Sequence, residues 1–389
     1  MNGSGLAADQ AVRIVLVSHY YPAHRGGVER VAGQLAERLA RAGVARIDWH
    51  ASDCDTPPDL AGVQCTPGRS WNAFERGLGF PYPIWTPSAL RRLGTAASNA
   101  DVVHLHDCLY LPNVVAFLAA RLAGRPVLVT QHIGFVPYRN PLLRLLVGAA
   151  NRRVGGFVLG RATRVVFESE TVRRYFERFV RFREPPLLVP NGVDTEAFAP
   201  AEPAHKEALR AQQGANPGTP LFLFVGRFVE KKGLPVLRAL AGHFPSVRWI
   251  LAGWGSLDPQ AWGLPNVTVV RSPSIRELLP LYQAADLFVL PSAGEGFPLA
   301  VQEAMACGTP ALIGTETAAG SPDAPILSET TTAEDTAARW IARIDALLRE
   351  PQTLDDLRPR VAAFAREQWS WQACVDRYAA VLRGRTQTA

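Results

Sequence analysis

Residues 291–308 read PSAGEGFPLAVQEAMACG and directly follow the apolar run LFVL at residues 287–290. Such a short apolar run favours a buried strand. Proline has no N–H to lose at the first position of a helix, so Pro298 begins a predicted helix of roughly three turns. Gly308 can supply the left-handed residue that ends it. The stretch therefore predicts a strand, a loop and a helix, the repeating unit of parallel α/β sheets.

Two carboxylates flank the start of this predicted helix, Glu295 in the loop and Glu303 in the helix body. The free N–H groups and the positive dipole end of a helix N-terminus favour an anion such as a diphosphate. Carboxylates accept hydrogen bonds from sugar hydroxyls but repel phosphate, so the glutamates suit hydroxylated rings beside that anion. We expect the same ligand to contact the residues where loop and helix join: Gly296, Phe297, Pro298 and Leu299.

Length and composition indicate a soluble protein of two domains. The chain has 389 residues, of which 48% are hydrophobic and 20% charged. No secretory signal precedes the apolar run at residues 12–17, and no apolar run approaches the roughly 20 residues of a membrane span, so we expect a cytoplasmic protein. The five cysteines are scattered, which predicts reduced packing residues and no metal centre.

Positive charge is concentrated in the segment between Arg139 and Arg183, which holds eleven Arg and three Glu but no Lys or Asp. An anionic membrane surface on the inner face of the cell membrane, or a phosphate-bearing acceptor, fits this excess, helped by the apolar run at residues 142–147. A solvated arginine-rich face fits it equally. No nucleic-acid-binding motif accompanies the charge, so we expect no nucleic acid partner.

Apolar strands alternate with helical patterns in both halves of the chain, which predicts two doubly wound parallel sheets. We place the domains at residues 1–190 and 191–365, and we expect residues 366–389 to form a helix that packs back on the first domain. Between the predicted strands of the two halves, region 199–220 carries no strand signal. The predicted strands are residues 12–17, 102–105, 127–130 and 164–167 in the first half, and 221–225, 249–252, 267–270 and 287–290 in the second; the predicted helices include 28–40, 234–241 and one from Ile275.

Several motifs in a fixed order make the chain resemble family 4 of the glycosyltransferases, retaining enzymes of the GT-B fold. The likeness covers almost the whole chain. Its motifs are YYP at residues 20–22 with GGVE at 26–29, TQH at 130–132, VPNGVD at 189–194, FVGR at 224–227, KKG at 231–233, LAGWG at 251–255, ADLFVLPS at 285–292 and the E-x7-E pair of Glu295 and Glu303. The resemblance implies two Rossmann-like domains facing across a cleft, with acceptor bound by the first and a nucleotide sugar by the second.

The basic residues after the strand at 221–225 are expected to hold the donor diphosphate. Arg227 and Lys232 follow the carboxyl end of that strand, where open α/β sheets bind ligands, and their charge can neutralise the leaving group as it departs. The resemblance implies donor contacts for both, and for Gly226. It also implies that Glu295 binds hydroxyls of the donor sugar and that Glu303 holds the nucleotide ribose. We infer no metal or other cofactor, because Arg227, Lys232 and helix ends are available to hold the diphosphate without one.

Three residues of the first half complete the predicted site. Gly26 and Gly27 open a helix without a Cβ, so the backbone can approach an anion, although a tight strand-to-helix turn explains them too. The resemblance places His132 near the donor sugar, where we expect it to position rather than to transfer a proton. An ordinary hydrogen-bonded histidine is the alternative, and we favour it for His19, His104 and His106. We identify no well-placed nucleophilic carboxylate in the first half.

We expect a retaining transfer of a hexose-type sugar from a nucleotide diphosphate sugar to a lipid-linked or polysaccharide acceptor. The alternatives are a small soluble acceptor, a nucleotide-sugar epimerase of the same fold, and a non-catalytic module that binds sugar nucleotides. A glycosidase needs carboxyls that face each other across the bond, roughly 5–9.5 Å apart. Two glutamates on one loop and helix do not provide that.

Overall fold

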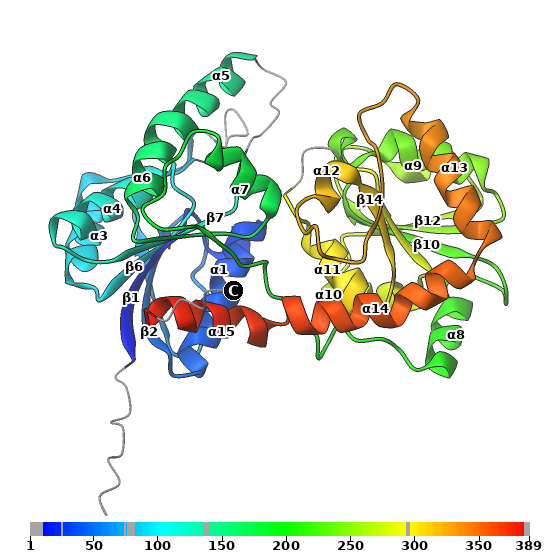
Figure 1. Cartoon of the computed structure of the whole chain (residues 1–389), viewed down its shortest axis with the longest axis horizontal. Helices are drawn as coiled ribbons and strands as arrows, with labels where there is room; N and C mark the ends of the chain where they lie inside the picture. The colour runs from blue at the N-terminus through cyan, green and yellow to red at the C-terminus, as the bar shows by residue number, and fades with distance from the viewer. Residues whose placement is uncertain are drawn as a thin grey trace, which may run out of the picture. The chain divides into compact units, whose positions relative to one another are not determined.

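The computed structural model describes residues 11–24, 26–73, 75, 82–134, 141–292 and 296–384, with the side chains of residues 141–143 left aside. The chain forms two compact units. Unit 1 comprises Met1–Glu168, Val172–Val189 and Cys374–Ala389, and unit 2 comprises Ser169–Thr171 and Pro190–Ala373. Each unit is built on its own sheet (Figure 1).

The sheet of unit 1 has seven strands in the order β3-β2-β1-β6-β7-β8-β9, and every pairing is parallel. A separate antiparallel pair joins β4 and β5. The strand bounds are β1 Val12–Val17, β2 Ala45–Ser52, β3 Val63–Gly68, β4 Ser70–Trp71, β5 Ile84–Trp85, β6 Val102–His106, β7 Val127–Gln131, β8 Arg164–Phe167 and β9 Leu187–Leu188.

Helices cover both faces of this sheet, because right-handed crossovers that leave β1 and β6 in opposite directions must lie on opposite faces. Helix α1 is on one face and the contacting pair α3 and α4 on the other (Figure 1). From α15, the Tyr378 hydroxyl lies 2.9 Å from Thr130 Oγ1. The helical bounds are η1 Pro22–His24, α1 Gly27–Arg41, α3 Pro87–Asn99, α4 Leu111–Leu122, α5 Pro141–Ala150, η2 Asn151–Gly155, α6 Gly156–Arg161, α7 Glu170–Glu177 and α15 Trp371–Leu382.

Unit 2 repeats this architecture with six parallel strands in the order β12-β11-β10-β13-β14-β15. Helices α9 and α13 contact each other, as do α11 and α14 and also α8 and α10. The bounds are α8 Pro203–Gln212, β10 Leu221–Arg227, η3 Glu230–Lys232, α9 Leu234–His243, β11 Arg248–Trp254, η4 Pro259–Trp262, β12 Val267–Arg271, α10 Ile275–Ala284, β13 Leu287–Leu290, α11 Leu299–Ala306, β14 Ala311–Gly314, α12 Thr315–Ala318, β15 Leu327–Glu329, α13 Thr336–Arg349 and α14 Gln352–Trp369.

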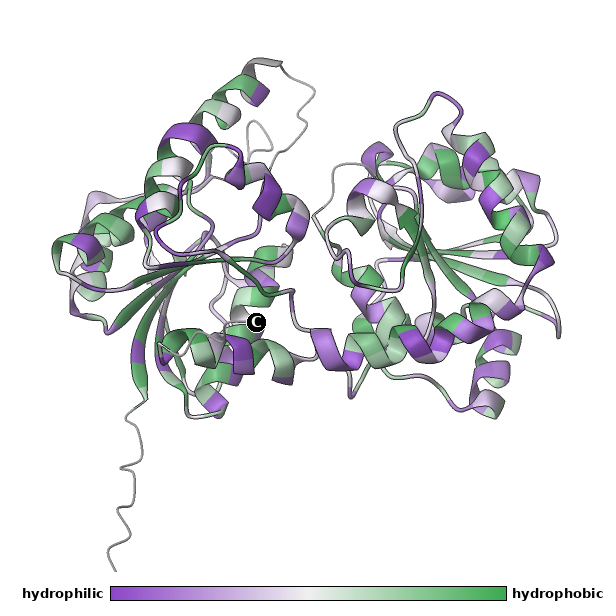
Figure 2. Ribbon diagram, viewed as in Figure 1, coloured by the Kyte–Doolittle hydropathy of each residue, from purple (hydrophilic) through white to green (hydrophobic). Residues whose placement is uncertain are grey.

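The core of each unit lies on its sheet, as Figure 2 shows by the hydrophobic colouring of the strands. All four residues of β13 and four of the six in β1 are buried, which is the pattern of parallel strands covered on both faces. Among the described residues, no helix is both long and apolar enough to cross a membrane.

The predicted doubly wound α/β fold is confirmed, and β1, β8 and β13 have the predicted bounds. One local prediction was wrong. Pro298 is the residue before α11, with φ −68° and ψ 135°, so the helix spans eight residues and about two turns. Gly308 does adopt the left-handed φ of +73°. Region 199–220 contains helix α8, whose Lys206 and Arg210 bind Asp286.

Candidate functional site

Strand order reverses at one point in each sheet, and loops after the flanking strands form a crevice at such a point in α/β folds. In unit 2 this point lies between β10, whose other neighbour is β11, and β13, whose other neighbour is β14. The loop after β10 carries the predicted basic residues, and the loop after β13 begins the 291–308 stretch. The topology therefore brings both predicted donor loops to one edge of one sheet.

Arg227 is the last residue of β10 and is exposed, while Lys232 ends the short helix η3 and is half-buried. In the parallel pair of β10 and β11, Arg227 lies opposite Trp254. The guanidinium carbon is 6.0 Å from the centre of the Trp254 ring, within the range of a cation–π contact. Gly226 precedes Arg227 in the same strand. These residues occupy the carboxyl end of β10, as the sequence predicts.

Gly233 joins the lysine loop to the loop after β13. It has φ +78°, and a Cβ at this position would lie 2.6 Å from the carbonyl carbon of Pro291 and closer still to its oxygen. Only glycine allows this backbone-to-backbone approach. Lys232 is thereby held beside the loop that leads to α11.

Helix α11 presents its N-terminus at the same edge. Gly296, Pro298 and Leu299 are half-buried, whereas Phe297 is buried with its ring centre 5.2 Å from that of Trp369. Phe297 therefore anchors the loop, and the other three residues border the helix start. Glu295 lies outside the described residues.

Glu303 lies in the second turn of α11 with 9% exposure. Tyr282 of α10 donates a hydrogen bond of 2.8 Å from its hydroxyl to Glu303 Oε2. This contact orients the carboxylate on the helix that begins beside Lys232. Tyr282 was not predicted, because it is 21 residues away in sequence and reads as an ordinary core aromatic.

The loop after β12 has an unusual backbone. Ser272 adopts φ +47°, a left-handed conformation. Its N–H donates to the Gly253 carbonyl at 2.8 Å. Non-glycine residues in this region carry strain, which is commonly found at ligand sites.

The corresponding edge of unit 1 lies between β1 and β6. Gly26 is the N-cap of α1, and a Cβ there would lie 2.7 Å from the carboxyl carbon of Glu29. Gly27 is exposed, and nothing lies within 4 Å of its Cβ position. A Cβ on Gly26 would thus displace the Glu29 carboxylate, which already lies at the helix start, while Gly27 leaves open backbone.

Glu29 forms a buried pair with His19, at 3.0 Å between Oε1 and Nε2. The His19 ring stacks on Tyr110 with ring centres 4.2 Å apart. Burial opposes charge on the Glu29 carboxyl, but the hydrogen bond and the charge of His19 hold its pKa below the usual value. The pair is therefore a fixed element of this edge rather than two independent side chains.

His132 follows β7 and is buried, as expected for a strand end at this edge. Its Nδ1 lies 2.7 Å from Glu168 Oε2 and its Nε2 lies 2.9 Å from His106 Nδ1. Both ring nitrogens are therefore bound within unit 1. Burial disfavours charge on His132, but Glu168 and then Asp107 outweigh it and raise its pKa above 6.5.

Asp107 closes this group from the loop after β6. It has φ +64°, and its Oδ1 accepts bonds from the His132 N–H at 2.9 Å, the Ile133 N–H at 3.1 Å and Gln131 Nε2 at 2.9 Å. Burial raises the pKa of its carboxyl. Sequence reasoning missed Asp107, Glu29 and Glu168. Asp107 and Glu168 follow the ends of β6 and β8, and both carboxylates are bound to neighbouring groups of unit 1.

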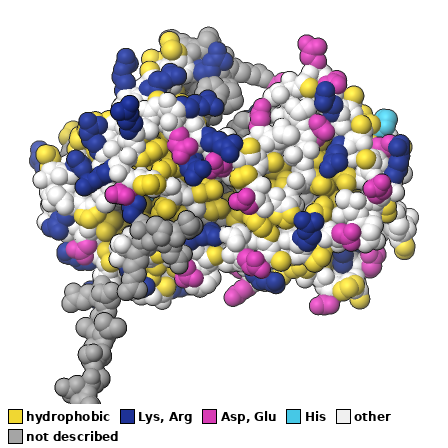
Figure 3. Space-filling view, viewed as in Figure 1, with side chains coloured by type: hydrophobic (Ala, Val, Ile, Leu, Met, Phe, Trp, Pro, Cys, Tyr) yellow, Lys and Arg dark blue, Asp and Glu magenta, His cyan; other side chains and the backbone are white. Residues whose placement is uncertain are grey.

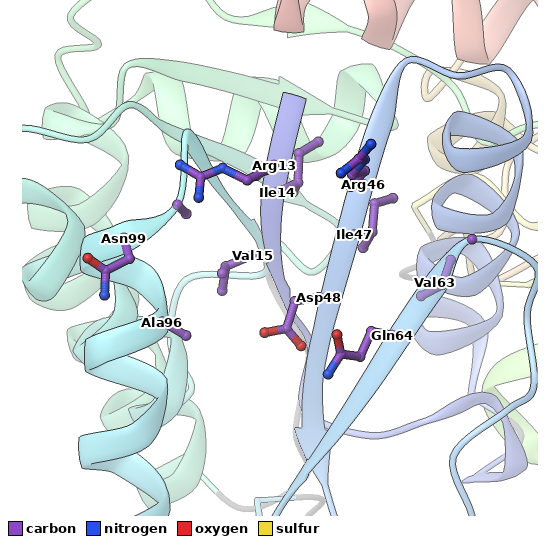
Figure 4. A pocket seen from close by; sticks show the side chains of 12 residues that line it. Arg13, Ile14, Val15, Arg46, Ile47, Asp48, Val63, Gln64, Ala96 and Asn99 are labelled. Atoms are coloured by element: carbon purple, nitrogen blue, oxygen red, sulfur yellow. The ribbon is translucent and has the colours of Figure 1, made fainter. Parts of the chain in front are cut away.

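A pocket of about 690 Å³ lies elsewhere in unit 1 (Figure 4). Arg13 and Arg46 line it from the starts of β1 and β2, and Asn99 from the end of α3. Arg13 pairs with Asp101 at 2.8 Å, and Asp48 accepts bonds from His50 and Thr66. Arg13 and Asp48 are thus bound to neighbours of the pocket, which lies at the sheet end opposite to the predicted site.

The basic segment forms α5, η2, α6, β8 and α7, of which α5, η2, α6 and β8 belong to unit 1, and Arg139 lies outside the described residues. Leu145 and Leu146 are 66% and 57% exposed, and Arg144, Arg152 and Arg153 are exposed beside them in the sequence. Figure 3 shows basic side chains interspersed with apolar ones over the part of unit 1 labelled α5 and α6 in Figure 1. The segment is basic and apolar on the same surface.

Comparison with known proteins matches both halves. Residues 25–197 match the model of Glycosyltransferase Family 4, and residues 205–367 match that of Glycosyl transferases group 1. The chain is 30% identical to the D-inositol 3-phosphate glycosyltransferase of Segniliparus rotundus, over 92% of this chain and 85% of that protein. It is 27% identical to the alpha-maltose-1-phosphate synthase of Mycobacterium tuberculosis, over 77% and 78% of the two chains.

Solved structures agree on the fold. Sucrose-phosphate synthase from Thermosynechococcus elongatus has a TM-score of 0.72 at 21% identity, covering 96% of this chain and 98% of its own. Anabaena HepE in complex with UDP has a TM-score of 0.72 at 20% identity, covering 96% and 100%.

The two parallel-sheet units, each with one strand-order reversal, have the GT-B fold of glycosyltransferases. The chain belongs to glycosyltransferase family 4. It is a hexosyltransferase that takes its sugar from a nucleotide-sugar donor.

Proposed function

We propose that the protein transfers a hexose, with retention of configuration, from a nucleotide diphosphate sugar to a hydroxyl of a small soluble acceptor. The donor part of this proposal rests on one observation. At Gly233, the loop that carries Lys232 closely approaches the loop before α11. One cationic loop and one helix N-terminus at a strand-order reversal suit a diphosphate.

In this mechanism Arg227 and Lys232 bind the diphosphate. Their attraction to the departing oxygen becomes stronger as negative charge grows on it. The first N–H groups of α11 contribute to the same anion site. Glu303, oriented by Tyr282, accepts hydrogen bonds from the ribose hydroxyls, and Glu295 accepts them from the donor sugar. Gly226, Gly296, Phe297, Pro298 and Leu299 shape the backbone around these groups. The leaving phosphate assists attack of the acceptor hydroxyl on the same face.

The acceptor proposal differs from our first expectation of a lipid-linked or polysaccharide acceptor. The relatives that cover most of the chain are named for D-inositol 3-phosphate and for alpha-maltose-1-phosphate, which are small and soluble. Unit 1 supplies the loops for such an acceptor, with Gly27 as open backbone and His132 as a positioning group. We therefore favour a small soluble acceptor over a lipid-linked or polysaccharide acceptor.

A two-stage experiment tests this proposal. UDP-, GDP- and ADP-sugars are screened by thermal shift, and the donor that stabilises the chain is then offered with inositol phosphates, sugar phosphates and neutral sugars while products are followed by mass spectrometry. We expect one nucleotide to shift Tm in the wild type and not in Lys232→Ala. Turnover only with a lipid-linked or polymeric acceptor would refute the small-acceptor proposal, and no shift with any donor would count against the donor site.

We further propose that the surface of α5, η2 and α6 binds anionic lipid and places the enzyme on the inner face of the cell membrane. Exposed arginines attract lipid phosphate, and the exposed Leu145 and Leu146 can enter the interface. Sedimentation with phosphatidylglycerol vesicles should retain the wild type, release it in high salt, and release Leu145→Asp/Leu146→Asp. Equal binding to phosphatidylcholine vesicles, or none to either, would refute this surface.

A further inference from the structure

Three side chains of unit 1 form a continuous hydrogen-bonded row at the carboxyl ends of β6, β7 and β8. Glu168 Oε2 lies 2.7 Å from His132 Nδ1, and His132 Nε2 lies 2.9 Å from His106 Nδ1. Both imidazole rings are buried, and their planes are within 17° of parallel. His106 Nε2, at the end of the row, is buried and has no hydrogen-bond partner among the described residues.

The row admits two proton arrangements, because only one proton fits between two ring nitrogens 2.9 Å apart. Glu168 accepts the proton on His132 Nδ1 in both. In the first, His132 is an imidazolium that donates from Nε2 to His106 Nδ1, so neutral His106 carries its own proton on Nε2. In the second, His132 is neutral and accepts from His106 Nδ1–H, which leaves a lone pair on His106 Nε2.

Passing from the first arrangement to the second moves one proton out of the row. The N–H bond at His106 Nε2 breaks and its proton leaves to water or a substrate oxygen, while the proton between the rings moves from His132 Nε2 to His106 Nδ1. His132 loses its positive charge, and no other group changes. The outer nitrogen of His106 thereby switches from a hydrogen-bond donor to an acceptor.

The surroundings favour charge on His132 rather than on His106. Burial and the neighbouring His104 and His132 lower the pKa of His106 well below 6.5, so His106 stays neutral. Burial also opposes charge on His132, but its two nearby carboxylates outweigh it and raise its pKa above 6.5. The titratable groups around the two rings come from α1, β6, α15 and the loops after β1, β6 and β8: His19, Glu29, His104, Asp107, Glu168 and Tyr378.

We propose that Glu168 and His106 are positioning residues for sugar transfer: Glu168 holds His132 as an imidazolium, and His106 transmits that protonation state to its own Nε2 at the outer end of the row. The proposal deepens the proposed function and rests on it for the link to transfer. It also explains why His132 can act at this edge although neither of its ring nitrogens is available. His132 supplies charge through the row, and His106 supplies the hydrogen bond.

Nitrogen NMR of the full-length protein labelled with ¹⁵N-histidine tests the row without any substrate. Between pH 5 and 9 we expect His132 Nδ1 to stay protonated, His132 Nε2 to titrate above pH 6.5, and His106 Nε2 to change from protonated to bare in the same step. In Glu168→Gln the titration should move down by about one unit or more. A neutral His132 throughout, or a bare Nδ1, would overturn the proposal.

The pH profile of kcat/KM provides the second readout. The wild-type rate should fall above the pKa of His132, and Glu168→Gln should bring this fall to lower pH by the NMR shift, about a tenfold loss for each unit. Glu177→Gln is the matched control, since it removes a partly exposed carboxylate from α7 that pairs with Arg173 at 3.6 Å. If Glu168→Gln and Glu177→Gln gave the same pH profile of kcat/KM, the proposed link between the row and sugar transfer would be refuted. An inactive wild type with the expected NMR titration would refute the proposed function and leave the row standing.

Discussion

Substitution of Gly233 by alanine tests whether the site of unit 2 depends on one backbone contact. An L-residue at φ +78° costs about 1–2 kcal/mol. The added Cβ would lie 2.6 Å from the carbonyl carbon of Pro291, where contacts below 3.0 Å are essentially never seen, so the two loops must part by about 1 Å. Overpacking of this kind adds about 1–3 kcal/mol.

We therefore expect Gly233→Ala to lose about 2–5 kcal/mol of unfolding free energy, measured by urea denaturation. This corresponds to a fall in Tm of about 4–20 °C for a unit of this size. Because Lys232 moves with the loop, kcat/KM for the donor should fall about 100-fold, as expected for a 1 Å displacement of a catalytic group.

Gly242→Ala is the control, because this glycine lies within α9 and nothing is within 4 Å of its Cβ position. Alanine is favoured over glycine inside a helix, so Gly242→Ala should stabilise the protein by about 0.5–1 kcal/mol and leave activity unchanged. If Gly233→Ala retains the stability and the donor affinity of Gly242→Ala, the argument that Gly233 joins the two loops is refuted.

Lys232→Ala should reduce kcat/KM for the donor by about 10²–10³-fold, because stabilisation of the leaving group is lost. Lys231→Ala should change kcat/KM by less than about threefold. Equal steady-state kinetics of the two variants would contradict this prediction. Tyr282→Phe removes the bond to Glu303, so unfolding in urea should be easier by about 1–2 kcal/mol and calorimetry should show weaker nucleotide binding. Burial, and then the charge of Arg358, lower the pKa of Lys206 to about 8. The unfolded state holds that proton more tightly, so wild-type stability should gain about 1–3 kcal/mol between pH 8 and pH 10, a gain that Lys206→Met should lack. An equal gain in both proteins would assign it to another group.

Local sequence pattern predicted most of the strands and the order of the site loops. The apolar runs that became β1, β8 and β13 are short, bounded by loop residues and buried on both faces, so their periodicity leaves little choice. Boundaries were less certain where capping decides them. Pro298 fits both the first helical position and the residue before it, and the sequence does not distinguish these.

Most contacts between particular side chains could not be predicted from the sequence. Glu168 is 36 residues from His132, and Tyr282 is 21 residues from Glu303. Each pair meets only because the elements that carry the two residues lie side by side in the folded unit. The prediction that His106 is an ordinary hydrogen-bonded histidine did not identify its partner, since a histidine in a strand gives no sign of the imidazole beside it.

The sequence by itself determined the main strands, that Arg227 and Lys232 lie at the carboxyl end of one strand, and that Glu303 lies in a helix after another, because backbone geometry imposes its period on residues that are neighbours in the chain. Only the tertiary structure decided that Gly233 contacts Pro291 and that Glu168, His132 and His106 form one row. Those contacts depend on the order of strands in each sheet, and strand order follows from the packing of the whole unit rather than from any local pattern.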